Sequence, residues 1–240
     1  MKALKFLFIA AVLVASLASC EAPHVFVDTK LKPNATEYAV EGRQNTFKNQ
    51  MTIGEFAFTD IQYGSITTNS SELFFKKQDT VKSKISFKMK YKGMEAETSY
   101  TVRAITKSLF FGKMEMPDDA KDEYIGQIQM KDSSAWDFNV KNLNSINWPS
   151  LAGGCATNGT KRIEIKDVRK AEGTTSWVEP STIFGYTYNV NNDPIAVVET
   201  IAGKGGVWIK KGLDPETEFM VANLAAAMLL RPDLSNTARR

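Results

Sequence analysis

One segment near the C-terminus determines the architecture of this chain: Phe219-Met220-Val221-Ala222-Asn223-Leu224-Ala225-Ala226-Ala227-Met228-Leu229-Leu230. Asn223 is its one polar residue, and the residues three and four positions away on either side are apolar. A helix that is apolar on every side must be buried on every side, in a protein core or in a membrane. Such a helix rises about 18 Å, too little to cross a hydrocarbon core of about 30 Å. We therefore expect protein to surround it.

The residues that flank this segment predict where the helix begins and ends. Asp214 is a good N-cap, Pro215 suits the first helical turn, and Pro232 stops the helix soon after Arg231. Acidic residues in the first turn complement the positive end of the helix dipole. These signals predict a helix over about 215–231.

The rest of the chain, from about residue 36 to 211, shows the period-two alternation of strands with one buried face. The clearest case is residues 84–91, where Ile, Phe, Met and Tyr share one face and three lysines share the other with a serine. Lys92-Gly93 then predicts a turn, and Tyr100, Val102 and Ala104 continue the alternation on the expected hairpin partner. The pattern predicts about a dozen strands.

These elements predict a mostly β domain spanning residues 36–240. The simplest arrangement is a closed antiparallel barrel of about twelve strands wrapped around the buried C-terminal helix. A lipocalin-like barrel with an external helix is the alternative, but an external helix should keep a polar stripe.

The N-terminus has the three parts of an export signal. Lys2 and Lys5 are followed by an apolar core over 6–15 and then by Leu17-Ala18-Ser19-Cys20. The last four residues resemble the lipobox of bacterial prolipoproteins, which implies cleavage after residue 19 and lipid attached to Cys20. The apolar stretch is too short for a transmembrane anchor. We expect a signal peptide over 1–19, a lipidated tether over 20–35, and stable attachment to a membrane by more than one acyl chain.

The expected location is the bacterial cell envelope. Position 21 is Glu, whereas Asp at this position resembles an inner-membrane retention signal, so the analogy favours the outer membrane. Of 30 basic residues, Lys2 and Lys5 belong to the signal, which leaves 28 against 27 acidic ones. This near balance gives no argument for nucleic acid as a partner.

Two scarce residue types limit the chemistry. His24 is the only histidine and lies in the expected tether, which excludes a histidine-based triad or a histidine-ligated zinc from the folded domain. With Cys20 acylated, Cys155 has no partner for an internal disulfide. We expect no cofactor and no metal.

The C-terminal quarter resembles a known fold family. Ile183-Phe184-Gly185-Tyr186, Asp193-Pro194-Ile195-Ala196-Val197-Val198, Gly206-Val207-Trp208-Ile209 and Asp214-Pro215 before the apolar helix are similar to the end of the tubby C-terminal-like superfamily, which includes tubby and the phospholipid scramblases. The resemblance covers about the last 55 residues. It implies a twelve-stranded barrel closed around a hydrophobic helix and a bias towards lipid headgroups. The scramblases' cysteine run, calcium loop and membrane-spanning end have no counterpart here.

Five features are candidate sites, each with a simpler structural reading. Lys84, Lys88, Lys90 and Lys92 form a possible stripe for anionic lipid, or a solvated strand face. Cys155 is a possible reactive thiol or a buried inert one, and Asn223 needs a hydrogen-bond partner in the core. The acidic run is a possible calcium site or a solvated turn, and the tryptophans line a ligand cavity or belong to the core. The acidic run comprises Asp118, Asp119, Asp122 and Glu123, and the tryptophans are Trp136, Trp148, Trp177 and Trp208.

No assembled catalytic group is evident, so we expect a non-enzymatic envelope lipoprotein that binds a lipid headgroup or a protein partner through its outer surface. A structural or assembly subunit of an envelope complex is the second expectation. An enzyme built on carboxylates such as Asp118 and Glu123 is the third.

Overall fold

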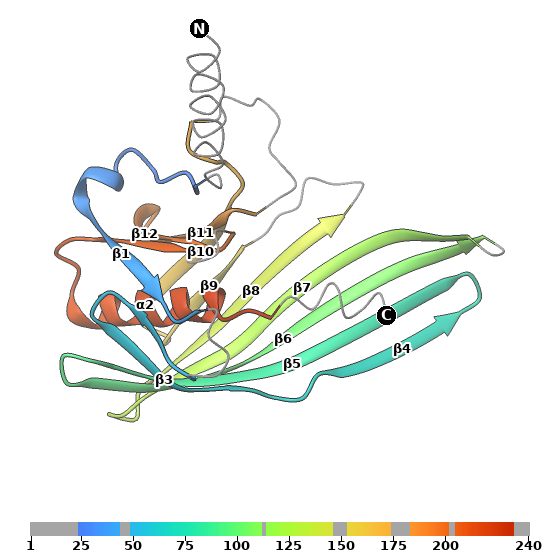
Figure 1. Ribbon diagram of the computed structural model, residues 1–240, viewed down its shortest axis with the longest axis horizontal. Helices are drawn as coiled ribbons and strands as arrows, with labels where there is room; N and C mark the ends of the chain where they lie inside the picture. Colours follow the sequence, from blue (N-terminus) through green and yellow to red (C-terminus); the bar gives the residue numbers. More distant parts are fainter. Residues whose placement is uncertain are drawn as a thin grey trace, which may run out of the picture.

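The computed structural model describes residues 24–43, 49–111, 114–145, 153–173, 183–201 and 205–232. These residues form a short 3-10 helix (η1, Lys32–Asn34), thirteen strands and one α-helix (α2, Pro215–Leu229) (Figure 1). The strands are β1 (Ala35–Glu41), β2 (Met51–Ile53), β3 (Phe56–Tyr63), β4 (Thr67–Leu73), β5 (Lys76–Tyr91), β6 (Met94–Phe111), β7 (Met114–Met130), β8 (Ala135–Ser145), β9 (Gly153–Thr157), β10 (Arg162–Val168), β11 (Gly185–Val190), β12 (Asp193–Glu199) and β13 (Gly206–Lys210).

The sheet closes on itself as the alternation predicted. Its antiparallel order runs β3-β2-β1-β13-β12-β11-β10-β9-β8-β7-β6-β5, and β3 then pairs with β5, with Ala57 opposite Lys90. Twelve strands therefore form a closed barrel, and β4 stands outside it on the far part of β5. The predicted mostly β, closed antiparallel barrel is confirmed.

The predicted hairpin at residues 84–104 is also confirmed. In β5 the odd-numbered residues face inward, and Ile85, Phe87 and Met89 are almost completely buried. Lys92 and Gly93 make the turn with φ of 46° and 83°, and Ile85 lies opposite Tyr100 on β6.

α2 lies inside the barrel and fills its interior. Each of residues 219–230 is 3% exposed or less, and they form one core cluster with the inward faces of the strands. The carboxylate of Asp214 accepts a hydrogen bond from the Thr217 backbone N–H at 3.1 Å, which is the predicted N-cap. Because α2 has no exposed face, the alternative barrel with an external helix is wrong.

Polar contacts fix the helix against β6. The Asn223 amide donates to the Phe219 carbonyl at 3.1 Å, and its oxygen accepts from the Thr98 hydroxyl at 3.0 Å. One turn further on, the Tyr100 hydroxyl donates to the Ala227 carbonyl at 2.9 Å. The structural hydrogen-bond partner expected for Asn223 is therefore confirmed.

A second apolar cluster covers part of the outside of the barrel. Val25, Val27 and Leu31 are buried against Val197 and Trp208, whose side chains point outward from β12 and β13. The backbone there also forms a bridge between Val25 and Ala171. Residues 24–34, which we expected within a tether over 20–35, thus belong to the folded body.

The strands β4–β7 continue past the point where β3 closes the barrel and form a projecting arm (Figure 1). We define the arm as β4 together with Lys76–Lys82 of β5, Arg103–Leu109 of β6 and Met116–Glu123 of β7, which pair in that order. Seven residues of strand correspond to about 20 Å of reach. The turn Phe74-Phe75, between β4 and β5, lies at its end.

Candidate functional site on the outer surface

Three of the four predicted lysines lie on the outward side of the β5–β6 hairpin. Lys84, Lys88 and Lys90 alternate with buried residues along β5, so they share one outer face, as the alternation predicted. Lys92 is in the turn that follows, and its Nζ lies over the ring of the buried Tyr91, 4.5 Å from the ring centroid.

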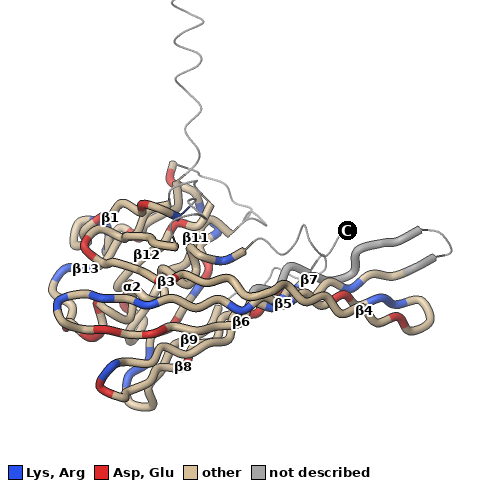
Figure 2. The backbone as a smooth tube through the Cα atoms, turned by 60° about the horizontal axis from the view of Figure 1, so that its bottom comes forward, with Lys and Arg blue, Asp and Glu red and all other residues tan. Residues whose placement is uncertain are grey.

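Acidic residues on the neighbouring strands accompany these lysines. Glu97 and Glu95 of β6 lie opposite Lys88 and Lys90, and Figure 2 shows the basic residues of β5 beside acidic ones on β6. Lys88 Nζ is 3.0 Å from the Asp60 carboxylate, and Lys90 Nζ is 3.4 Å from that of Glu95. The face is a mixed-charge surface, and it carries less positive potential than a bare lysine stripe would.

The charge pairs shift the pKa values in the directions that ion pairs cause. The hydrogen bond to Asp60 raises the pKa of Lys88, and the hydrogen bond from Lys131 lowers the pKa of Glu95. Each group is thereby held in its charged form near neutral pH.

A shallow hollow of about 250 Å³ opens on this face at the hairpin end of the barrel. Lys88, Lys90 and Lys131 line it together with Glu95 and Glu97. Its mixed lining suits a ligand with both charges or a polar protein surface.

The acidic run does not form the expected solvated turn. Residues 118–123 lie within the long strand β7, and the pairing shifts by one residue next to Pro117. Proline lacks the N–H that a regular ladder needs, so it is found at such irregular positions. Asp122 pairs with Arg231 at 3.5 Å, and Glu123 with Lys121 at 2.5 Å.

Glu123 is unsuited to donate a proton in catalysis. The hydrogen bond from Lys121 lowers its pKa, so the carboxyl is ionised at neutral pH. A general acid needs the opposite shift. No group of His, Cys, Asp and Glu side chains with the geometry of a metal site occurs among the described residues.

Cys155 lies on β9, half-buried on the outer side and not fully buried as we expected. Its neighbours across the ladder are Glu164 and Asn139. Neither of these two partners is a cation or a histidine of the kind that activates reactive cysteines.

The tryptophans separate into two groups. Trp136 is completely buried in the barrel core, and Trp208 is 9% exposed in the outer cluster under residues 24–34. Both are therefore packed in apolar clusters, as the simpler expectation held. Trp148 and Trp177 lie outside the described residues.

His24 belongs to the folded body, contrary to its expected place in a free tether. Its ring Nδ1 is 3.4 Å from one oxygen of the buried Glu199, whose other oxygen accepts from the Val25 backbone N–H at 2.9 Å. Glu199 thus fixes the point at which the N-terminal segment joins the barrel.

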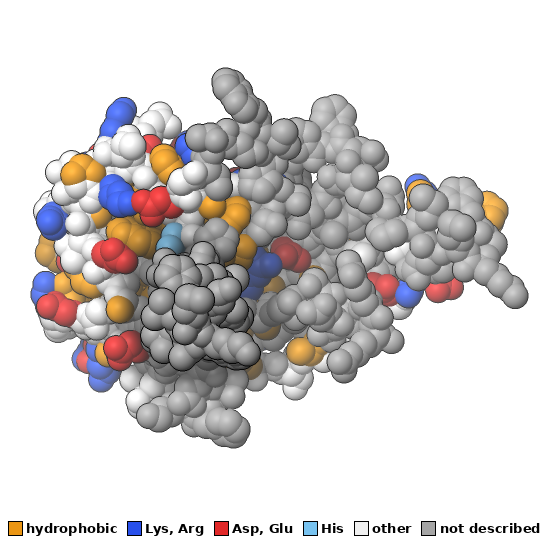
Figure 3. All heavy atoms as spheres, turned by 45° about the horizontal axis from the view of Figure 1, so that its top comes forward, with side chains coloured by type: hydrophobic (Ala, Val, Ile, Leu, Met, Phe, Trp, Pro, Cys, Tyr) orange, Lys and Arg blue, Asp and Glu red, His pale blue; other side chains and the backbone are white. Residues whose placement is uncertain are grey.

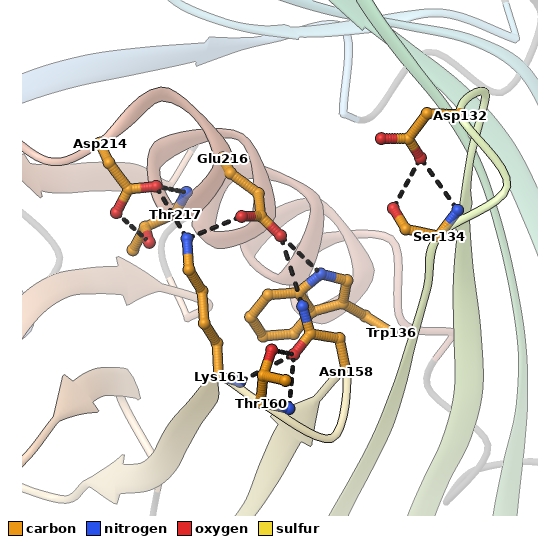
Figure 4. A network of polar contacts seen from close by, with 9 residues as sticks. All are labelled: Asp132, Ser134, Trp136, Asn158, Thr160, Lys161, Asp214, Glu216 and Thr217. Carbon is orange, nitrogen blue, oxygen red and sulfur yellow. Dashed lines mark hydrogen bonds and ion pairs between the residues drawn. The ribbon is translucent and has the colours of Figure 1, made fainter.

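The densest polar network of the described part surrounds the start of α2 (Figure 4). The Glu216 carboxylate accepts from the Trp136 indole at 3.3 Å and from Lys161 Nζ at 2.7 Å. Lys161 also reaches Asp214 at 3.1 Å. These contacts join the start of α2 to β8 and to the turn between β9 and β10, so the network helps to hold the helix in the barrel.

The feature that sequence reasoning missed is the end of the arm. Leu73, Phe74 and Phe75 are 71%, 93% and 69% exposed, although alternation predicted a half-buried strand over residues 72–75. Figure 3 shows hydrophobic side chains at this end of the molecule. The available signal was three consecutive large apolar residues followed by Lys76 and Lys77.

The lipid-attachment residue Cys20 and the signal segment 1–19 lie outside the described residues. Among the helices of the described part, none combines the length and apolar character needed to cross a bilayer. No family model matches the chain, and neither a curated protein nor a solved structure matches it.

Proposed function

We propose that this chain is an envelope lipoprotein, cleaved after Ser19 and anchored by lipid at Cys20. In this proposal it acts without catalysis, as a binding module that uses the outer surface of its barrel for lipid headgroups or a protein partner. The resemblance of the C-terminal quarter to the tubby-like superfamily supports the lipid version.

The observation that carries the proposal is the filled interior. Residues 219–230, from α2 and its C-cap, occupy the place where a ligand-carrying barrel has its cavity. The hollow on the lysine face and a second one on the arm, lined by Leu73, Lys76 and Lys107 among others, both open on the outside. A ligand is therefore expected on the outer surface.

The packed N-terminal segment supports attachment close to a membrane. With Val25 held by Glu199 and Ala171, only residues 21–23 separate Cys20 from His24. Four steps of extended chain span about 14 Å at most. The anchor would therefore hold the barrel near the bilayer, with the face around Val25 towards it.

Metabolic labelling with radioactive palmitate tests the anchor. We expect label in the native chain, none in Cys20→Ala, and release of the native protein from membranes only by detergent. Absence of label from the native chain would remove the lipoprotein assignment.

A charge-reversal pair tests the lysine face. In the unacylated mature chain, Lys88→Glu with Lys90→Glu should lower salt-sensitive binding to phosphatidylglycerol vesicles, whereas Lys141→Glu with Lys166→Glu, at exposed positions on β8 and β10, should not. Because both lysines are exposed, the charge reversal is expected to change folding stability little. Equal binding by the two variants would exclude this face.

The open edge of β4 favours assembly with a protein as the second candidate. All seven of its residues are exposed, and unpaired strand edges are templates for strand addition. A cross-link from Asn69 to a defined envelope protein would support it, and the absence of any stable partner in gentle cross-linking would count against it.

A further inference from the structure

We propose that the end of the arm, Leu73-Phe74-Phe75, is a membrane-inserting tip that docks into the surface of a bilayer containing anionic lipid. The inference deepens the proposed function, and it rests on that proposal in taking a membrane as the surface concerned. It places a second membrane contact at the end of the arm, at the other end of β5 from Lys88 and Lys90, whose contribution the charge-reversal pair tests separately.

The exposure of the tip is the first observation. Phe74 is 93% exposed and its two neighbours are about 70% exposed, more than any other large apolar residue among those described. Scattered single apolar residues on a surface need no explanation, but a contiguous group marks an interaction site.

The backbone at Phe74 is the second observation. Phe74 has φ of 53°, in the left-handed region that bulky side chains avoid. The hairpin turn Asn191-Asn192 uses asparagine, which tolerates this region, at φ of 51° and 64°. An exposed aromatic residue in a strained turn adds nothing to the core, so the strain points to a function of the side chain.

Charge around the tip is the third observation. Lys76 and Lys107 are exposed and both line a hollow of about 280 Å³ beside Leu73. Neither forms an ion pair with a side chain whose position the structure describes, although Asp119 lies opposite Lys107 in the ladder and the exposed Glu72 precedes Leu73. The nearby Asp79 is buried and neutralised by Lys77 at 3.1 Å and by the Ser70 hydroxyl at 2.6 Å. Free lysines next to apolar residues complement anionic headgroups above a hydrocarbon layer.

The strand beside the tip repeats part of this sequence. Leu109-Phe110-Phe111 is followed in the sequence by Gly112-Lys113, and the ladder places Leu109 opposite Lys76.

The shape of the tip favours a bilayer over a protein. Stable protein interfaces need about 800 Å² on each partner, whereas three side chains at a convex hairpin end cover far less. A bilayer accepts such a tip, with aromatic rings at the headgroup level. Weak insertion suffices for a chain already tethered, because the anchor supplies a high local concentration.

The test uses the unacylated chain from Glu21 onward, since the described fold begins at His24, with vesicles of phosphatidylethanolamine and phosphatidylglycerol. Phe74→Asn places at this turn the residue type found at Asn191. It should lower vesicle partition at least tenfold, roughly the worth of burying one Phe side chain, while the melting temperature stays level or rises. Ile125→Asn, which removes an apolar residue 49% exposed on the barrel, should leave partition unchanged.

The inference is overturned if the unsubstituted, unacylated chain does not bind the vesicles. It is equally overturned if Phe74→Asn binds them as strongly as the unsubstituted chain does. It is also overturned if position 74 cross-links to an envelope protein while vesicle partition is unaffected by the substitution. Because this chain lacks Cys20, failure of the tip and failure of the lipid anchor are separate results.

Discussion

At the scale of single residues, the polar groups inside the barrel determine how α2 sits. The apolar surface of the helix has no direction of its own, because every face is buried. The amide of Asn223 and the carbonyl of Ala227 do have a direction, and both are bonded to β6. These two contacts fix the rotation and depth of the helix.

Replacing Thr98, the hydrogen-bond partner of Asn223, should lower the unfolding free energy more than replacing both residues together. Thr98→Val leaves the buried Asn223 oxygen without its donor, at an expected cost of about 1–3 kcal/mol of unfolding free energy. Thr98→Val combined with Asn223→Leu removes both polar groups and should recover part of that loss. Urea unfolding of the two single variants and the pair measures this, and additive losses would contradict it.

The N-cap of α2 should make folding stability sensitive to acid. The Thr217 hydroxyl and backbone N–H, with Lys161, lower the pKa of Asp214 in the folded state. Its stabilisation is therefore present above the ordinary carboxyl pKa and is lost as pH falls through the lower, folded-state value. Asp214→Asn should flatten the pH dependence of the melting temperature below about pH 4, and Asp28→Asn should not. Identical profiles for both variants would contradict this.

At the scale of strands and helix, the sequence patterns predicted which elements are present better than they predicted how long each strand is. Alternation identified β5 and β6 because one face of each strand meets α2. It did not show that these strands run on past the barrel, since the arm also alternates, with Asp79 and Val81 buried between more exposed residues. Only the pairing partners, β3 along one part of β5 and β4 along the other, reveal where the barrel ends.

The close approach of β8 and β9 depends on one glycine. A Cβ at Gly154 would lie 1.8 Å from the Asn139 carbonyl oxygen, whereas one at the adjacent Gly153 would meet its nearest atom at 3.0 Å. Gly154→Ala should therefore cost about 3 kcal/mol by forcing the strands apart, and Gly153→Ala about 1 kcal/mol or less. Thermal unfolding compares them, and equal losses would contradict the account.

Deleting α2 should abolish cooperative folding. A chain that ends at Leu213 would leave the inward faces of twelve strands around an empty space, which a closed barrel cannot collapse to fill. A chain that ends at Pro232 keeps all the described contacts of α2 and should melt cooperatively. Calorimetry distinguishes them, and a cooperative transition in the shorter chain would show that the helix is dispensable.

At the scale of the whole molecule, the described chain has a filled barrel, a covered outer face and a projecting arm. The sequence indicates that the outer face of β12 is covered, because Ile195–Val198 is apolar without alternation, as in strands buried on both faces. The sequence did not predict which residues cover this second face. Val25, Val27 and Leu31 do so, but these three apolar residues are too few to form a sustained helical or strand pattern. Candidate sites were harder to predict than the fold, because exposure at the arm depends on where the strands leave the barrel.

The central claim is that α2 permanently fills the barrel, which leaves function to the outer surface. Native-state amide hydrogen exchange tests it most directly. We predict that the amides of residues 219–230 exchange only through global unfolding, with the slowest barrel strands. Exchange of these amides through a local opening, at lower free energy than the surrounding strands, would show that the interior can be vacated and would contradict the account.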